Sequence, residues 1–225
     1  MNIEEYKRIK DNLPANVQLI AVSKTKPAED IRTLYNEGQR LFGENKAQEM
    51  KSKHEMLPSD IQWHFIGHLQ SNKIKYIAPF VTLIHSIDSY ELLKEVNKQA
   101  VKNDRILNCL LQFHVAQEET KFGFSIEECE AMLQDADFSQ LTHVNIQGVM
   151  GMASFTDNQD QVRREFATLH SYFSLLQEKH FAGKADFKEL SMGMSEDYPI
   201  AIEEGSTLIR VGSAIFGARI YPANE

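Results

Sequence analysis

The 225-residue chain has little of several features that mark common protein classes. It holds only two cysteines, Cys109 and Cys129, in no CxxC pair, so neither a disulfide framework nor an oxidising compartment is expected. No apolar run approaches the roughly 18 residues of a membrane span, and the charged start MNIEEYKRIKDNL is unlike a signal peptide. A formal net charge of −8 argues against a general nucleic-acid binder. The absences therefore predict a cytoplasmic protein that binds neither membrane nor nucleic acid.

What the sequence does contain is a repeated alternation of strands and helices. Eight short β-rich apolar runs are separated by segments with helical signals: VQLIAVSK, RLFGEN, IQWHFIGH, VTLIHSID, LNCLLQFHV, VNIQGVMGM, FKELSMGM and STLIRVGS. No Pro, Gly or Ser-rich linker interrupts the series, so residues 1–225 are expected to form one domain. Eight such units favour an α/β fold with a closed (β/α)8 barrel. An open doubly wound sheet is less favoured, because no GxGxxG or GxxxxGK[ST] follows the first strand.

Several helix boundaries are readable from capping residues. Pro27 and Gly38 frame the helix after the first strand, and an extra helix from about residue 1 to residue 12 precedes that strand. Four polar pairs with the spacing of a capping box predict other helix starts: Asn45 with Gln48, Asp88 with Glu91, Ser125 with Glu128, and Thr156 with Gln159.

The carboxyl ends of the strands are where a barrel places its function. Lys24 ends the first strand with the same side-chain parity as Ile20 and Val22, so it is expected to point into the barrel mouth. Lys26 stands before Pro27 and a helix start, and we expect it to leave toward water.

The turns after the last two strands are rich in small and hydroxyl residues. Ser195 follows the seventh strand, and Gly212 and Ser213 follow the eighth, at helix starts that suit an anion. Arg210 adds charge-assisted donors nearby. A phosphate site opposite a lysine suggests pyridoxal phosphate, whose aldehyde condenses with an amine to an imine.

The same residues carry a family resemblance. Seven stretches share it: AVSKTKP, FGEN with QE shortly after, WHFIGHLQSNK, HSIDS, QEETKFGF, LSMGMSEDYPIAIEEGST and IRVGSAIFGAR. Together they resemble the pyridoxal phosphate homeostasis proteins, the YggS/PROSC family. The resemblance implies a barrel similar to the amino-terminal domain of alanine racemase, of the fold-type III class.

The resemblance also implies the contacts of the cofactor. Lys24 would form the imine, Ser195, Gly212 and Ser213 would contact the phosphate, and Arg210 would lie close to the cofactor. Asn45, at the end of the second strand, is the remaining candidate cofactor contact. Because imine formation needs a neutral amine, we expect Lys24 to be partly desolvated.

The chain departs from the family pattern at a few positions. Ala47 stands where a bulky apolar residue is usual, and Phe113-His114 stands where the fifth strand often carries Val-Asn. We therefore expect His114 to alter what packs beneath or beside the cofactor ring.

The resemblance implies a carrier or buffer of pyridoxal phosphate that serves vitamin B6 homeostasis and has no established catalytic residue. Its partners would be apoenzymes that use the cofactor or enzymes of the B6 pathway, and the chain is expected to be a monomer. The alternative is a racemase-like enzyme, which needs a second acid or base such as His85 or Tyr198. We expect the chain to be too short for the second domain of a racemase, which favours the carrier.

A distant alternative is a metal-dependent barrel hydrolase. It depends on four histidines on or just beyond different strands: His64, His68, His85 and His114. No HxH pair occurs among them, so no metal is expected.

Overall fold

The computed structural model describes residues 1–116 and 122–217, and its core is a closed barrel of parallel strands in chain order. The strands are β1 (Gln18–Val22), β2 (Leu41–Glu44), β3 (Gln62–Phe65), β4 (Leu83–Ile87), β5 (Leu107–Gln112), β6 (Val144–Met150), β7 (Glu189–Ser191) and β8 (Leu208–Val211). The barrel closes where β1 pairs with β8, with Ile20 beside Arg210. The predicted (β/α)8 fold is confirmed, and each predicted run contains one strand.

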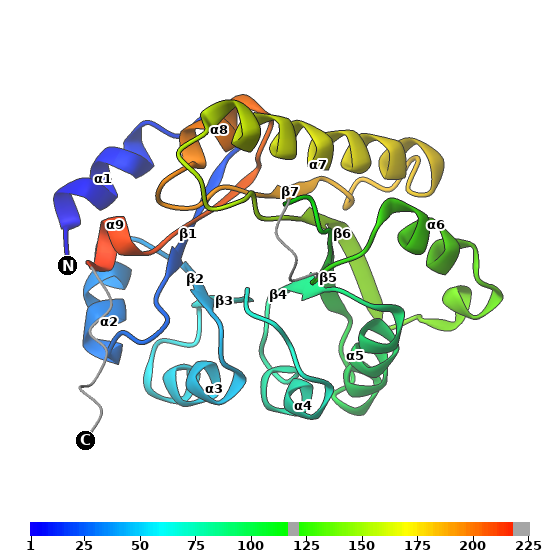
Figure 1. Ribbon diagram of the computed structural model, residues 1–225. Helices are drawn as coiled ribbons and strands as arrows, with labels where there is room; N and C mark the ends of the chain where they lie inside the picture. Colours follow the sequence, from blue (N-terminus) through cyan, green and yellow to red (C-terminus); the bar gives the residue numbers. More distant parts are fainter. Residues whose placement is uncertain (117–121, 218–225) are drawn as a thin grey trace, which may run out of the picture.

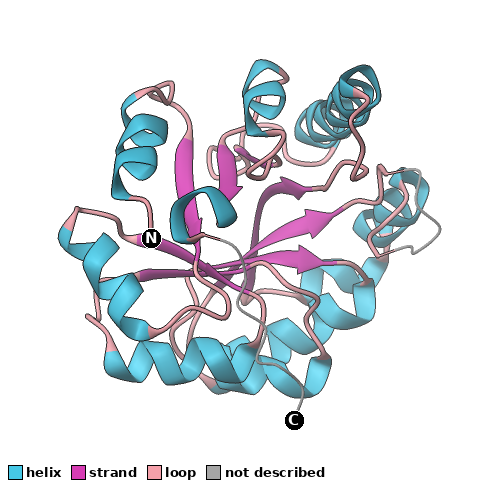
Figure 2. Cartoon of the chain, turned by 60° about the vertical axis from the view of Figure 1, so that its left-hand side comes forward, coloured by secondary structure: helices cyan, strands magenta, loops and turns pink. Residues whose placement is uncertain are grey.

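Each strand is followed by at least one helix, and the helices lie outside the strands (Figure 2). They are α2 (Ala28–Asn36), α3 (Ala47–Met56), α4 (Ile74–Ile77) after the 3-10 turn η1 (Ser71–Lys73), α5 (Tyr90–Lys102), α6 (Ile126–Gln134) with η2 (Ala136–Gln140), α7 (Gln159–Lys179), α8 (Tyr198–Glu203) and α9 (Ser213–Phe216). The predicted extra helix is α1 (Ile3–Asp11). It lies beside α9 (Figure 1), where the Asn2 N–H donates to Ile215 O at 2.6 Å. No helix in the described part of the chain combines the length and apolar character needed to cross a bilayer.

Two apolar layers explain why the strands are apolar at successive positions. In β1, Leu19 and Ala21 belong to the large cluster between strands and helices. Ile20, between them, faces the barrel interior, where it packs with four side chains from other strands: Leu83, Leu110, Met150 and Leu208. Alternate side chains therefore enter alternate layers, and the predicted orientation of Ile20 is confirmed.

Some helix boundaries follow the predicted signals. Ser125 and Glu128 form a reciprocal capping box at the start of α6. Pro27 is the N-cap of α2, and Gly38, with φ of 91°, follows its end.

The other three predicted caps are wrong by one or two residues. The observed N-caps are Lys46, Ser89 and Asn158, in place of Asn45, Asp88 and Thr156. The side chains of Ser89 and Asn158 accept from the third helical N–H, whereas Lys46 makes no side-chain cap bond. The sequence pattern cannot choose between neighbouring polar residues, because the local backbone decides which of them is the cap. Asp88 does not cap the helix, and its Oδ2 atom lies 3.2 Å from His68 Nδ1.

Two parts of the predicted motifs lie outside the described residues. They are residues 117–121 of QEETKFGF and the end of IRVGSAIFGAR, which begins the segment 218–225.

Candidate functional site

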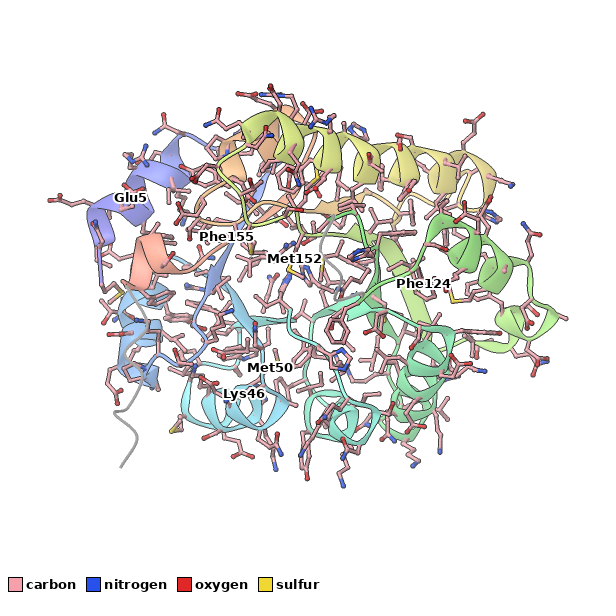
Figure 3. All side chains as sticks on the ribbon, viewed as in Figure 1. Glu5, Lys46, Met50, Phe124, Met152 and Phe155 are labelled. Atoms are coloured by element: carbon pink, nitrogen blue, oxygen red, sulfur yellow. The ribbon has the colours of Figure 1, made fainter. Side chains whose placement is uncertain are left out.

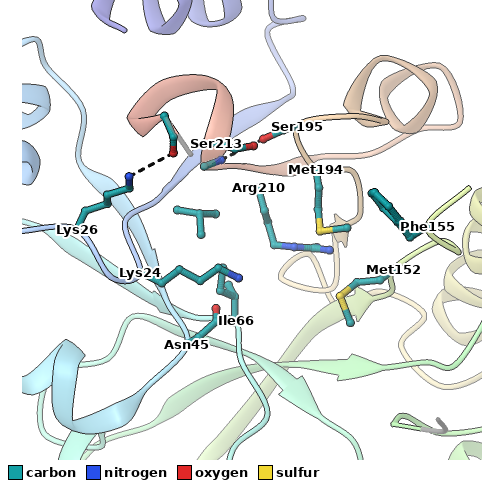
Figure 4. A pocket seen from close by; sticks show the side chains of 13 residues that line it. Lys24, Lys26, Asn45, Ile66, Met152, Phe155, Met194, Ser195, Arg210 and Ser213 are labelled. Carbon is teal, nitrogen blue, oxygen red and sulfur yellow. Dashed lines mark hydrogen bonds between the residues drawn. The ribbon is translucent and has the colours of Figure 1, made fainter. Parts of the chain in front are cut away.

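A cavity of about 330 Å³ opens at the carboxyl-terminal mouth of the barrel. All six predicted cofactor contacts line it (Figure 4): Lys24, Asn45, Ser195, Arg210, Gly212 and Ser213. The barrel thus brings together residues from the ends of β1, β2, β7 and β8, as parallel strands that end at one face require.

Lys24 occupies a tight turn directly after β1. Val22 and Lys24 both line the cavity, above the interior residue Ile20. The predicted parity is therefore correct. Lys24 is half-buried, and its side chain reaches into the same space as that of Arg210 (Figure 4).

Lys26 differs from its prediction. Instead of leaving toward water, it is half-buried and lines the same cavity. Its Nζ donates to Phe216 O at 3.0 Å and to Gly217 O at 3.2 Å, at the end of α9. The carbonyl oxygens that end a helix attract a cation, and only the closure of β1 against β8 brings that helix end within reach.

Asn45 lines the cavity although it caps no helix. Its Oδ1 atom is buried and has no hydrogen-bond partner among the described residues. The backbone packs closely here, since a Cβ atom on Gly67 would lie 2.4 Å from Asn45 O. A buried amide with an unsatisfied oxygen, held at the wall of a cavity, retains hydrogen-bonding capacity for a ligand.

The turns after β7 and β8 meet, as predicted. The Gly212 N–H donates to Ser195 Oγ at 3.4 Å, and Ser213 begins α9. Gly193 makes the first turn possible, because its φ is 94° and a Cβ atom there would lie 2.6 Å from Ala201 Cβ. Ser195, Gly212 and Ser213 therefore line the cavity together.

Arg210 is a charged side chain inside the barrel, with 4% of its surface exposed. It donates from Nη1 to Ser191 Oγ at 2.6 Å and from Nη2 to Gly151 O at 3.1 Å. Burial lowers the pKa of Arg210 to about 10, and the nearby Asp197 charge opposes this. The guanidinium remains a cation at neutral pH and is fixed in place by two acceptors.

Two histidines continue this hydrogen-bonded chain into the barrel. Ser191 Oγ lies 2.9 Å from His85 Nδ1, and His85 Nε2 lies 2.9 Å from His64 Nδ1. Burial lowers the pKa of His64 to about 4 and that of His85 well below its ordinary value. Both rings are therefore neutral at pH 7.

The histidines do not converge as the hydrolase alternative requires. His64 and His85 contact each other in the interior, whereas the exposed His68 faces Asp88 and His114 lines a neighbouring cavity. No cluster of three or more His, Cys, Asp or Glu within residues 1–116 and 122–217 could hold a metal ion.

An apolar wall of the cavity was missed by the sequence reasoning. Met152 and Phe155, between β6 and α7 (Figure 3), line it with Met194 and Ile66. Phe155 is 90% exposed, so no burial pattern in the sequence marks it. His114 lies across this wall, in a cavity of about 210 Å³ that shares Met152, Phe155 and Met194 with the first. The departure at His114 thus affects the neighbouring cavity, and His114 does not line the first.

Comparison with known proteins identifies the family of this chain. The family model described as "Alanine racemase, N-terminal domain" matches residues 3–220. The pyridoxal phosphate homeostasis protein of Aquifex aeolicus is 40% identical over 205 residues, which cover 91% of this chain and 88% of the relative. That of Haemophilus influenzae is 37% identical over 212 residues, 93% of this chain and 88% of the relative.

Solved structures show the same relationship. PipY of Synechococcus elongatus, solved without PLP, is 38% identical with a TM-score of 0.88, over 95% of this chain and 99% of that one. PipY with PLP bound is 37% identical, with a TM-score of 0.86 and the same coverage. An alanine racemase of Clostridium difficile shares the fold, with a TM-score of 0.72 at 14% identity over 98% of this chain and 56% of that one. This chain therefore belongs to the pyridoxal phosphate homeostasis protein family, whose barrel is that of the alanine racemase N-terminal domain.

Proposed function

We propose that this protein binds pyridoxal phosphate covalently and reversibly on Lys24 and serves cofactor homeostasis as a carrier or buffer. The charge of the cavity supports this most strongly. Its lining holds three basic side chains, Lys24, Lys26 and Arg210, and no carboxylate among the described residues. In a chain of net charge −8, such a cavity selects an anionic ligand.

The donor set fits this cofactor. When bound, pyridoxal phosphate supplies an aldehyde that condenses with a primary amine, together with a phosphate that can be held elsewhere. Lys24 provides the amine at one wall. Ser195, Ser213 and the backbone of Gly212 would hold the phosphate at the opposite wall, where backbone N–H groups and hydroxyls suit an anion.

Arg210 and Asn45 would complete the binding of the cofactor. Arg210 is already held by Ser191 and Gly151, so its donors are positioned before a ligand arrives. Asn45 brings an amide whose oxygen has no partner among the described residues. The names of the relatives, and the PLP bound in one PipY structure, support the same ligand.

The lining supports a carrier over a racemase-like enzyme. A racemase needs a second acid or base on the face of the cofactor opposite the lysine. The two candidates for that role, His85 and Tyr198, are not among the residues that line the cavity, and His85 is fully buried beneath it. Apart from Lys24, the titratable lining groups among the described residues are Lys26, bonded to two carbonyls, and Arg210.

The wider biological setting is part of the same proposal. We propose a monomeric, single-domain protein of the cytoplasm. Of these properties, the reducing compartment suits the two buried free thiols. Its partners would be apoenzymes that take up the cofactor or enzymes of the B6 pathway.

Borohydride trapping tests the assignment. Protein incubated with pyridoxal phosphate should show visible absorbance that borohydride bleaches while fixing the cofactor to the peptide that contains Lys24. Lys24→Ala should abolish the adduct, whereas Lys51→Ala, at an exposed lysine of α3, should leave it intact. An undiminished adduct in Lys24→Ala would overturn the proposal. Repeated entry of solvent deuterium into the α position of alanine, serine or threonine would instead establish the racemase-like alternative.

A further inference from the structure

Lys24 lies at the centre of a strained turn. The Lys26 N–H donates to Ser23 O at 3.0 Å, which places Lys24 and Thr25 at the two central positions. Thr25 has a φ of 64°, in the left-handed region. Turns with a positive φ at the second central position normally carry glycine there, and a β-branched residue in this region is strained. Something outside the turn must therefore hold it.

Two side chains of α3 contact the turn on either side of Lys24. The Thr25 N–H donates to Glu49 Oε1 at 2.6 Å, and Lys53 Nζ donates to Ser23 O at 2.8 Å. Glu49 and Lys53 are four residues apart on one helix face and are joined at 2.7 Å. Both neighbours of Lys24 are thus bonded to one short stretch of helix.

A buried carboxylate anchors this pair to the barrel. Glu44, at the end of β2, accepts from Lys53 Nζ at 2.7 Å and from Ser23 Oγ at 2.6 Å. Glu44 is 0% exposed and Lys53 is 5% exposed. Burial raises the pKa of Glu44 to about 7, and the Lys53 cation opposes this rise. Buried ionic groups are costly to retain, and Glu44 and Lys53 both contact Ser23 in the turn that carries Lys24.

We infer that Glu49, Lys53 and Glu44 are positioning residues that hold the strained turn and thereby fix the direction in which the Lys24 amine enters the cavity. Lys24 has a long side chain, so a small change in the backbone conformation at its Cα is enough to move the amine away from a reacting atom. The inference rests on the proposed function only in assigning the reaction with the cofactor to Lys24.

Substitution of Glu49 tests this most cleanly, since its side chain is 23% exposed and its loss leaves the buried pair of Lys53 and Glu44 in place. Glu49→Ala should slow borohydride-trapped attachment of pyridoxal phosphate roughly tenfold. In the protein without cofactor, it should also speed hydrogen exchange at the Thr25 amide. The matched control is Glu55→Ala, which removes an exposed carboxylate of the same helix and should change neither measurement.

Rescue separates positioning from a general structural role. Glycine adopts a positive φ without strain, and Thr25 is exposed. Thr25→Gly in the Glu49→Ala protein should therefore restore most of the lost rate of attachment. Lys53→Met, compared with Lys51→Met on the exposed face, should slow attachment at least as much as Glu49→Ala, provided that it folds.

The outcomes distinguish this inference from the proposed function. Attachment by Glu49→Ala at the wild-type rate would overturn the inference, and so would a loss that Thr25→Gly does not rescue. If wild-type protein forms no trapped adduct, the proposed function fails, while hydrogen exchange at Thr25 still decides whether Glu49 holds the turn.

Discussion

His85 Nε2 lies 2.9 Å from His64 Nδ1 inside the barrel, where apolar side chains normally fill the space. Two protonated rings would each present a hydrogen at this contact, so at least one ring must be uncharged for the bond to form. Through Ser191, the pair reaches Arg210 at the floor of the cavity. A polar chain within the barrel thus supports the one buried cation that lines the site among the described residues.

The histidine pair predicts a loss of stability in acid. In the folded protein, burial lowers the pKa of His64 from 6.5 to about 4. Between these two pH values, the unfolded chain binds a proton at His64 and the folded chain does not. The stabilising contribution is complete above pH 6.5 and is lost as the pH falls toward 4. The difference between the two pKa values of His64 corresponds to about 3 kcal/mol of unfolding free energy.

Urea unfolding at pH 7 and pH 4.5 measures this effect. We expect His64→Gln, whose amide can still donate and accept, to reduce the difference in unfolding free energy between the two pH values. His170→Gln, at an exposed position, should leave that difference as in wild type. An unchanged pH dependence in His64→Gln would contradict the assignment of a neutral buried ring.

Ser191 should link protein stability to cofactor binding. Ser191→Ala removes the oxygen that Arg210 Nη1 and His85 Nδ1 share, so two buried groups lose a partner. We expect a loss of about 1–3 kcal/mol of unfolding free energy, together with weaker binding of pyridoxal phosphate in an absorbance titration.

The matched control for Ser191 is another buried serine. The Ser206 hydroxyl, in a residue that is 1% exposed, lies within hydrogen-bond distance of backbone oxygens of β7, β8 and the turn after β7. Ser206→Ala should destabilise the protein without the same change in affinity of the folded protein. Equal effects on affinity would show that the link through Arg210 is unimportant.

Gly193 should be intolerant of a side chain. Gly193→Ala meets both a φ of 94° and a Cβ contact of 2.6 Å with Ala201. We expect about 1–3 kcal/mol of destabilisation and weaker cofactor binding, because the turn that carries Ser195 must shift. Gly183→Ala, which has a positive φ but no atom within 4 Å of its Cβ, isolates the cost of the backbone conformation. Similar losses in the two variants would argue against a role for the close contact.

A negative charge in the cavity should oppose the ligand. Asn45→Asp places a carboxylate in a lining that otherwise contains none among the described residues. We expect affinity for pyridoxal phosphate to fall by roughly tenfold or more, since a like charge near an anion is repulsive. Gln48→Glu adds the same charge at an exposed position of α3 and should have a smaller effect. An affinity unchanged in Asn45→Asp would place the anion elsewhere.

Much of the fold and six residues of the cavity lining were predictable from the sequence. Strand positions follow from apolar runs, and the inward direction of Lys24 follows from its parity with Ile20, because alternation along a strand is a local property. One error was local and one was tertiary. Asn45 was assigned as a cap although Lys46 holds that position, and Lys26 was expected in water although it binds the end of α9.

The groups that support the site were not predictable in the same way. His85 and Ser191 are 106 positions apart in the sequence yet 2.9 Å apart in the barrel. Lys53 reaches Ser23 across 30 positions. Neither contact has a periodicity that a sequence pattern could reveal.

The sequence by itself determined the alternation of strands and helices, the strand face that carries Lys24, and the polar turns after the last two strands. Backbone conformation and side-chain parity are set by residues close together in the sequence, so these three features can be read without the tertiary structure. Only the tertiary structure decided that Lys26 joins the cavity, that Glu49 and Lys53 hold the turn around Lys24, and that two neutral histidines lie below Arg210. Those contacts exist because closure of β1 against β8 and packing of α3 bring distant residues within hydrogen-bond distance.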